Sequence, residues 1–371
     1  MTKMKFVISR EALLKPLNLV AGVVERRQTL PILSNVLLEL EGNQLSITGT
    51  DLEVELVGRV VLDQAPETGG EITVPARKLA DICKSLPDGS EIEFTQDDQR
   101  VIIRSGRSRF TLSTLAASDF PNVEESPGSQ DFTVKQGDLK RLIDRTSFAM
   151  AQQDVRYYLN GMLWEVQSGQ LRVVATDGHR LALCTLATSI ETTENLQVIL
   201  PRKGVVELAR LMMKESDDVR LVIGSNHIRA TTDEYTFTSK LVDGKFPDYD
   251  RVLPKASTKT IFGSRDELRQ AFSRTAILSN EKYRGVRLLL SNDTLQIVAN
   301  NPEQEEAEEI VSVDYQGESL EIGFNVSYLL DVLGVLKGET IKLSLADANS
   351  SALLEESEEG DSMYVVMPMR L

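Results

Sequence analysis

The chain has 371 residues and carries 41 Lys and Arg against 56 Asp and Glu, which gives a net charge of −15. This length exceeds what one ordinary hydrophobic core accommodates and suits about three domains. No apolar run reaches about 18 residues, and no long apolar segment follows the first residues, so we expect a cytoplasmic protein without signal peptide or membrane span. Whether translation starts at Met1 or Met4 stays open.

Cysteine usage and charge narrow the function further. Cys83 and Cys184 have no paired spacing, so we interpret them as reduced core thiols and not as a disulfide or metal site. The acidic net charge argues at first against a nucleic-acid partner, because binding a polyanion needs clustered Lys and Arg. The distribution of the charge matters more than its sum.

Three markers recur along the chain at one period. An apolar strand with an Asp or Asn six residues after a Leu appears at Leu45, Leu171 and Leu295, which lie 126 and 124 residues apart. The same spacings separate the starts of three helical segments and, in the first two copies, a Phe-Pro pair: Pro75, Pro201, Asn325, Phe120-Pro121 and Phe246-Pro247. The sequence therefore predicts three tandem copies of one domain, over residues 1–125, 126–253 and 254–371.

Each copy is expected to hold two helices and about eight antiparallel strands, an α+β arrangement. Apolar residues at spacings of three and four predict one buried stripe on each helix. The expected helices, in chain order, are Ser9–Val24, Pro75–Leu86, Lys135–Met150, Pro201–Met213, Ser264–Leu278 and Asn325–Lys337. Ser9 and Ser264 are candidate N-caps. Strands over 34–40 and 45–48 should form a hairpin through Gly42.

The expected helices carry a positive excess that the rest of the chain lacks. Counted over residues 9–27, 75–85, 135–150, 201–214, 264–278 and 325–337, they hold 19 Lys and Arg against 9 Asp and Glu. Six helices of about 10 Å width on a circle leave a hole of about 9 Å, which is too narrow for a DNA duplex. Twelve helices, from two chains, leave about 28 Å, enough for a duplex with a water layer. The charge pattern thus favours a two-chain ring around DNA.

Closing such a ring needs a contact between the first copy of one chain and the third copy of the other. Basic residues lie on or beside predicted strands of the first copy, and an acidic run lies beside those of the third: Arg100, Arg104, Arg107, Arg109, Glu303, Glu305, Glu306, Glu308 and Glu309. Sheet-edge pairing with matched charge is one interpretation. A solvated acidic loop, or a metal site in a nuclease, remains the alternative.

Several strings of the chain resemble the bacterial DNA polymerase III β subunits, the sliding clamps, over essentially the whole length. They are Leu30–Leu33, Ser105–Phe110, Gln153–Gly161, Ala175–Leu181, Asn300–Ile310 and Val365–Leu371. The resemblance implies a head-to-tail homodimer whose six domains form a ring, with helices inside and sheets outside. It also implies a non-catalytic processivity factor that encircles duplex DNA without sequence specificity, associated with the nucleoid. Its implied partners are the replicative polymerase, a separate clamp loader and other proteins with a short clamp-binding motif.

The resemblance assigns two further sets of residues. The positions similar to the family's DNA-contacting set are Arg27, Arg77, Gln153, Tyr157, Tyr158, Arg202 and Lys203. For Tyr157, core packing is an equal alternative. The expected dimer interface consists of Lys78, Arg100, Arg107, Arg109, Leu112, Ile277, Leu278, Glu303, Glu305 and Glu306.

Family relatives bind a short partner motif of apolar and Gln residues in a groove beside the second and third domains. The matching walls are Leu159, Thr176, Gly178, His179, Arg180, Leu181, Pro247, Arg251, Val252, Asn325, Tyr328, Ser351, Val365, Val366, Met367, Pro368, Met369 and Arg370. An extended peptide gains affinity from such apolar pockets with a few polar groups. The alternative is that the terminal Val and Met residues only finish an edge strand. Asn349, where relatives have an apolar residue, and Glu25, beside a supposed DNA contact, depart from the family pattern.

The competing class is a metal-dependent nuclease that would use Asp177, His179 and the acidic run Glu303–Glu309. His179 has no counterpart in the other two copies, and His227 has no ligand spacing to it. No phosphate-binding loop of the G-x-x-x-x-G-K-[ST] type occurs. We therefore expect no catalytic residue, no metal and no cofactor.

Overall fold

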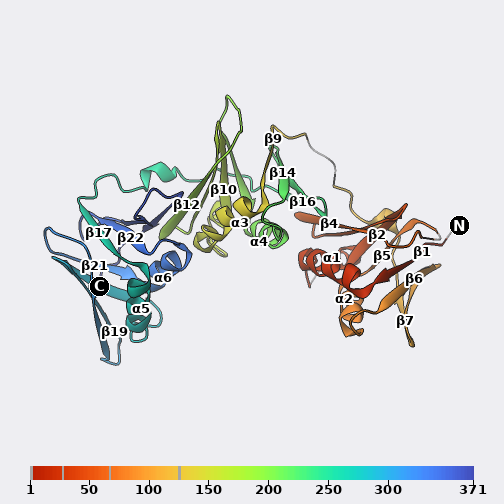
Figure 1. The fold of residues 1–371 in the computed structure, drawn as a ribbon, viewed down its shortest axis with the longest axis horizontal. Helices are drawn as coiled ribbons and strands as arrows, with labels where there is room; N and C mark the ends of the chain where they lie inside the picture. The colour runs from red at the N-terminus through yellow and green to blue at the C-terminus, as the bar shows by residue number, and fades with distance from the viewer. Residues whose placement is uncertain (1–2, 27–28, 67, 124–126) are drawn as a thin grey trace. The chain divides into compact units, whose positions relative to one another are not determined.

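The computed structural model describes residues 3–26, 29–66, 68–123 and 127–371, drawn in Figure 1. The chain forms two compact units: unit 1 comprises Met1–Leu139 and Lys203–Leu241, and unit 2 comprises Lys140–Arg202 and Val242–Leu371. The division falls inside helix α3 (Gln136–Asp144) and at the start of helix α4 (Arg202–Leu211). In the described ranges, no helix is both long and apolar enough to cross a membrane.

Unit 1 contains two antiparallel sheets and the helices α1 (Arg10–Val23) and α2 (Ala76–Ser85). Its strands are β1 (Lys5–Ser9), β2 (Asn35–Glu41), β3 (Gln44–Thr50), β4 (Val54–Val61), β5 (Gly70–Pro75), β6 (Glu91–Asp97), β7 (Arg100–Ser105), β8 (Ser108–Ser113), β9 (Gln130–Lys135), β14 (Asp218–Ile223), β15 (His227–Thr231) and β16 (Tyr235–Lys240). One sheet has the order β5-β2-β3-β4-β16-β15-β14-β9, and the other has the order β1-β6-β7-β8. Helix α1 packs against α2 and lies on β3 and β4.

Unit 2 repeats this plan with helices α5 (Arg265–Ala276) and α6 (Val326–Val335). Its strands are β10 (Gly161–Gln167), β11 (Gln170–Thr176), β12 (Arg180–Ala187), β13 (Leu196–Pro201), β17 (Lys259–Ser264), β18 (Gly285–Ser291), β19 (Thr294–Asn300), β20 (Glu306–Ser312), β21 (Leu320–Asn325), β22 (Thr340–Leu345), β23 (Ala352–Glu356) and β24 (Ser362–Val366). One sheet has the order β13-β10-β11-β12-β24-β23-β22-β17, and the other has the order β20-β19-β18-β21. Helix α5 packs against α6 and against β19 and β20.

The α+β class and the three similar copies are confirmed. In the described part of the chain, strands β1–β8, β9–β16 and β17–β24 follow one another with two helices in each set. Short 3-10 helices complete the connections: η1 (Pro31–Ser34), η2 (Ala117–Asp119), η3 (Ser147–Ala149), η4 (Tyr157–Leu159) and η5 (Tyr249–Arg251). Both predicted caps are present, since Ser9 Oγ accepts from Ala12 N at 3.2 Å and Ser264 Oγ accepts from Glu267 N at 3.3 Å.

One predicted helix is shorter than expected. The segment 135–150 forms α3 only as far as Asp144 and then the separate turn η3. The hydroxyl of Thr146 donates to the carbonyl of Leu142 at 2.7 Å, and the backbone N–H of Thr146 turns to Ile143 O. This side-chain bond competes with the regular helical pattern, and the chain tightens into the 3-10 turn instead.

The recurring Asp or Asn occupies the same strand-end turn in all three copies. Asp51 Oδ1 accepts from Glu53 N and Val54 N, and Asp177 Oδ1 accepts from His179 N and Arg180 N. In the third copy, Asn301 Oδ1 accepts from Glu305 N at 2.9 Å. Each side chain thus accepts hydrogen bonds from backbone N–H groups of its turn. This structural role explains the recurrence of the residue without a catalytic function.

Candidate functional site

A hollow of about 480 Å³ lies in unit 2, where β11 and β24 end and β12 begins. Its lining combines apolar side chains with three arginines and comprises Arg156, Tyr158, Leu159, Thr176, Gly178, Arg180, Leu181, Phe246, Pro247, Tyr249, Arg251, Val252, Ser351, Val365 and Met367. Exposed apolar side chains border it, since Val252 is 42% and Met367 47% exposed. A concave apolar surface with a few fixed polar groups suits an extended peptide or a small ligand.

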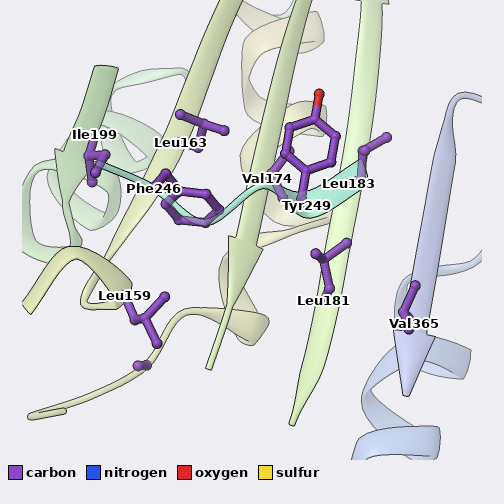
Figure 2. Close-up of a cluster of buried hydrophobic side chains, with 10 residues drawn as sticks. Leu159, Leu163, Val174, Leu181, Leu183, Ile199, Phe246, Tyr249 and Val365 are labelled. Atoms are coloured by element: carbon purple, nitrogen blue, oxygen red, sulfur yellow. The ribbon is translucent and has the colours of Figure 1, made fainter. Parts of the chain in front are cut away.

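The floor of the hollow is part of one buried apolar cluster, shown in Figure 2. Leu163, Val174 and Leu183 come from the neighbouring strands β10, β11 and β12. Phe246 and Tyr249 lie on the segment that crosses these strands (Figure 2). Because the strands alternate their side chains between two faces, the apolar residues of one face form a continuous floor under this segment.

A buried hydrogen-bond network holds Tyr249 in place. The Tyr249 hydroxyl donates to Glu165 Oε1 at 2.7 Å and accepts from Arg172 Nη1 at 3.0 Å. Gln197 Nε2 donates to the second oxygen of Glu165 at 2.5 Å. Burial, together with the Glu165 carboxylate, raises the pKa of Tyr249 to about 12. The network fixes η5, which carries Arg251 and leads into Val252 at the rim.

Arg180 is a fixed cation in the lining of the hollow. Its guanidinium lies between two aromatic rings, with Cζ 4.5 Å from the centroid of Tyr328 and 5.3 Å from that of Phe148. It also pairs with Asp177 at 3.2 Å and forms an ion pair with Asp331. These contacts preorganise the side chain, so a ligand need not order it.

The loop before β10 supplies a second arginine. Arg156 makes a bidentate pair with Asp154, at 3.0 Å from Nε and 2.9 Å from Nη2, and lowers the pKa of that carboxyl to about 2. Gly178 lies beneath this guanidinium with φ of 88°, and a Cβ there would come within 3.0 Å of Arg156. Glycine adopts this φ without strain and leaves room for the Arg156 guanidinium.

The structure brings most of the predicted groove residues together. Those that line the hollow are Leu159, Thr176, Gly178, Arg180, Leu181, Pro247, Arg251, Val252, Ser351, Val365 and Met367. Among the described residues, the predicted positions outside the lining are His179, Asn325, Tyr328, Val366, Pro368, Met369 and Arg370.

The predicted residues outside the lining have structural contacts of their own. His179 stacks on Tyr328 with ring centroids 6.3 Å apart. Asn325 caps α6 by accepting from Ser327 N at 2.9 Å. Met369 bonds through its backbone to Gly323 and lines a separate hollow with Arg370.

The sequence prediction omitted Arg156, Phe246 and Tyr249 from the lining, and it had assigned Tyr158 to DNA. The sequence could have identified Phe246, because this residue repeats Phe120 at the 126-residue period. The repeat could not have identified Tyr249, since the corresponding residue of the first copy is Val123. Its role follows from Glu165, which lies 84 positions earlier in the chain.

The residues predicted to contact DNA have varied surroundings. Arg27 lies outside the described residues. Arg77 is exposed on α2, Gln153 is exposed with φ of 55°, and Tyr157 is 58% exposed, whereas Tyr158 packs partly against the apolar cluster. Arg202 donates to Met150 O at 3.4 Å.

Lys203 is already engaged by oxygens of unit 1. Its ammonium donates to Val23 O at 2.9 Å and Glu25 Oε1 at 3.0 Å, and it forms an ion pair with Asp51. A phosphate would have to compete with these contacts for the lysine.

The two charged segments predicted to meet at a dimer interface lie at sheet edges. In the strand orders of the described chain, β8 is the outer strand of one four-stranded sheet and β20 is the outer strand of the other. Arg107 and Arg109 are exposed beside and on β8. Near β20, Ile277 is 75% and Ile310 64% exposed. Edge strands with exposed apolar and charged side chains are able to pair with another chain.

No group of three or more His, Cys, Asp or Glu side chains is placed to hold a metal ion within the ranges that the structure describes. The carboxylate of Asp177 is used by its own turn and by Arg180. His179 is used in stacking on Tyr328. These structural contacts account for Asp177 and His179, so neither residue requires a catalytic role to explain its position.

Comparison with known proteins assigns the family. Models described as the N-terminal, central and C-terminal domains of the DNA polymerase III beta subunit match residues 4–124, 133–248 and 250–370. The chain belongs to the DNA polymerase III beta subunit family. Similar curated relatives include the beta sliding clamp of Pseudomonas aeruginosa, 68% identical over 368 residues, and that of Escherichia coli, 55% identical over 368 residues. Each alignment covers 99% of this chain and 100% of the relative.

Solved structures of the family agree with the fold. A Pseudomonas aeruginosa sliding clamp bound to griselimycin superposes with a TM-score of 0.97 at 68% identity and covers 100% of both chains. A Caulobacter crescentus beta sliding clamp superposes with a TM-score of 0.95 at 40% identity, covering 100% of this chain and 99% of its own. The family's three-domain clamp architecture therefore applies to the whole chain.

Proposed function

We propose that two copies of this protein join head to tail into a six-domain ring around duplex DNA, and that partner proteins dock in the hollow of unit 2. The ring has helices inside and sheets outside, and it tethers the replicative polymerase and other DNA-processing proteins. The observation that carries the docking role is the hollow itself, with its apolar floor and three rim arginines. The protein is a non-catalytic processivity factor, as its family relatives are, and needs no cofactor.

Docking in the hollow follows from its chemistry. An extended segment would place apolar side chains over Leu159, Leu181 and Val365, and Arg156, Arg180 and Arg251 would meet its polar or acidic groups. The Met367 side chain adapts its shape to different apolar partners. The wider partner surface in this proposal also includes the nearby His179, Asn325, Tyr328, Val366, Pro368, Met369 and Arg370.

The proposed DNA contacts are positively charged or aromatic and lie on or near the helices: Arg27, Arg77, Gln153, Tyr157, Tyr158, Arg202 and Lys203. Arginine and lysine meet phosphates without reading bases, which gives sequence-independent and salt-sensitive contacts. The exposure of Arg77 and Tyr157 supports this role. Lys203 contributes only as far as phosphate outcompetes Glu25 and Asp51.

The proposed dimer contact joins the β8 edge of one copy to the β20 edge of the other, with Lys78, Arg100, Arg107, Arg109 and Leu112 facing Ile277, Leu278, Glu303, Glu305 and Glu306. Opposite charges would set the register, and exposed Ile277 would supply apolar area. We also propose domain limits at 1–125, 126–253 and 254–371. A cytoplasmic, nucleoid-associated location follows from DNA as the partner.

Topological attachment distinguishes this function from ordinary DNA affinity. The protein, loaded by a clamp loader onto nicked circular DNA, is washed at a salt concentration that strips basic DNA-binding proteins. Retention on the circle and loss after the circle is linearised is the expected result. Equal loss from circular and linear DNA would contradict the ring.

A further inference from the structure

Unit 1 contains a second hollow, of about 370 Å³, which lies where β3, β4 and β16 meet. Its lining comprises Thr50, Leu52, Glu53, Val54, Glu55, Pro121, Asn122, Val123, His227, Thr238 and Lys240. None of these residues belongs to the DNA, dimer or groove sets described above. The size is comparable to that of the hollow in unit 2.

The two hollows are built by the same turn. Thr50 Oγ1 donates to Val54 O at 3.0 Å and accepts from Leu52 N at 3.0 Å. In unit 2, Thr176 Oγ1 donates to Arg180 O at 2.6 Å and accepts from Gly178 N at 3.2 Å. Leu52 has φ of 78°, close to the 88° of Gly178. The backbone of the turn is therefore conformationally equivalent in both units.

Strand register extends this equivalence to the floor. Glu55 lies opposite Thr50 on one side and opposite Thr238 on the other. Leu181 lies in the same way between Thr176 and Val365. At the rim, Lys240 N donates to Glu53 O at 2.8 Å, just as Met367 N donates to His179 O at 3.0 Å. Glu55 thus takes the place of Leu181, and Lys240 takes that of Met367.

The substitution changes what the hollow recognises. Where unit 2 has Leu181 and Val365 in its floor, unit 1 has a carboxyl and a hydroxyl among the apolar walls Val54, Pro121 and Val123. Burial raises the pKa of Glu55 to about 7, while nearby Arg229 acts in the opposite direction and Glu39 adds to the rise. The rim carries Glu53, which pairs with Lys240 at 3.6 Å, and His227. A ligand cation placed at Glu55 would offset the cost of burying its charge.

We propose that this hollow is a second docking site, which takes an extended segment of a partner protein carrying a Lys or Arg side chain directed at Glu55. The apolar walls receive the neighbouring side chains of that segment, as the floor of unit 2 does for its own ligand. The two hollows then select different sequences, because one has an apolar floor with a basic rim and the other has an acidic floor. A partner with both kinds of segment would bind a single protomer at two places.

The experiment uses the full-length protein and two dye-labelled hexapeptides, Ala-Leu-Arg-Leu-Phe-Ala and the same peptide with Gln in place of Arg. Each carries a photoreactive leucine, so that cross-linked residues identify the occupied hollow. Binding is measured by fluorescence anisotropy to wild type, Glu55→Gln and Glu55→Leu, with Glu91→Gln, at an exposed position of β6 outside the hollow, as the matched control. We expect the Arg peptide to cross-link to unit 1 and to lose about tenfold in affinity with both Glu55 variants.

The Gln peptide should bind all four proteins equally, and Glu91→Gln should change the affinity of the Arg peptide by less than about threefold, because Glu91 lies outside the hollow and exposed charges contribute little. Cross-links of the Arg peptide confined to the hollow of unit 2, or equal affinity for wild type and both Glu55 variants, would overturn the proposal. Neither of these outcomes would contradict the proposed ring or the groove of unit 2, since retention on circular DNA tests the proposed function separately. Circular dichroism of each variant checks that the fold is kept.

Discussion

Single residues decide how firmly the groove is held. Glu165 is a carboxylate only 4% exposed, and its oxygens accept from Tyr249 and Gln197. A buried charge is stable only when its hydrogen bonds are made. Tyr249 therefore acts twice, because its ring belongs to the groove floor and its hydroxyl satisfies the carboxylate behind that floor.

Removal of this hydroxyl should destabilise unit 2. We expect Tyr249→Phe to lower the free energy of unfolding by about 1 to 3 kcal/mol, because Glu165 loses a donor while it stays buried. Trp164 is the single tryptophan of the chain and neighbours Glu165 on β10, so its fluorescence during urea unfolding reports this transition. Tyr283→Phe, at a 57% exposed ring, is the control and should shift stability by less than about 0.5 kcal/mol. Indistinguishable curves for wild type and Tyr249→Phe would contradict the network.

Glu55 should make the stability of unit 1 depend on pH. Its pKa rises from 4.5 to about 7 on folding, mainly through burial. Below about pH 4.5 both states are protonated, and between about 4.5 and 7 the unfolded state loses its proton first. The free energy of unfolding must therefore fall as pH rises through this window, by about 1 to 3 kcal/mol after allowance for partial exposure.

Glu55→Gln tests this pH dependence. The variant should unfold at the same urea concentration as wild type at about pH 5 and at a higher concentration at about pH 8. Circular dichroism is the measurement, since the single tryptophan lies in unit 2. Glu53→Gln serves as the exposed control. A pH dependence that is identical in wild type and Glu55→Gln would show that Glu55 ionises normally.

At the scale of elements, the outer strands β8 and β20 matter most. A sheet edge presents unpaired backbone groups, and proteins protect such edges with charge or cover them with another chain. The β8 edge is basic, with Arg107 and Arg109, and the β20 edge is acidic. Two edges of the same kind would therefore repel each other, whereas a β8 edge and a β20 edge would attract. The charge pattern thus favours the proposed head-to-tail contact over a contact between two like edges.

Charge reversal at one edge should dissociate the dimer. We expect Arg107→Glu with Arg109→Glu to weaken the association at least about tenfold, because two attractive pairs become repulsive. Sedimentation velocity over a dilution series measures the change. Glu303→Arg with Glu305→Arg, mixed with the first variant, should restore the association in part. A first variant that stays as dimeric as wild type would refute this interface.

At the scale of the whole molecule, tethering separates into two independent functions. Encirclement depends on the closed ring, whereas recruitment depends on the hollow of unit 2. A tether raises the local concentration of a weakly bound partner, so neither function replaces the other. Variants at the hollow should therefore affect partners without affecting residence on DNA.

Val252→Ala with Met367→Ala tests that separation, because both side chains are partly exposed at the hollow. We expect affinity for a short peptide of apolar and Gln residues to fall about tenfold through lost apolar contact. Retention on nicked circular DNA should equal that of wild type. Val61→Ala, at a 67% exposed valine of β4, is the control for both measurements. Loss of DNA retention in the double variant would mean that the two functions are coupled.

The sequence by itself determined the repeat, the α+β class and the recurring strand-end position of Asp177, because these follow from local patterns that occur three times. Periodic apolar stripes and capping side chains act over a few residues and can be recognised without a fold. The tertiary structure decided that Tyr249 belongs to the groove, that His179 stacks on Tyr328, and that Glu55 is partly buried in the lining of a hollow. Burial and strand register bring distant residues together, so their consequences appear only once the strands have paired.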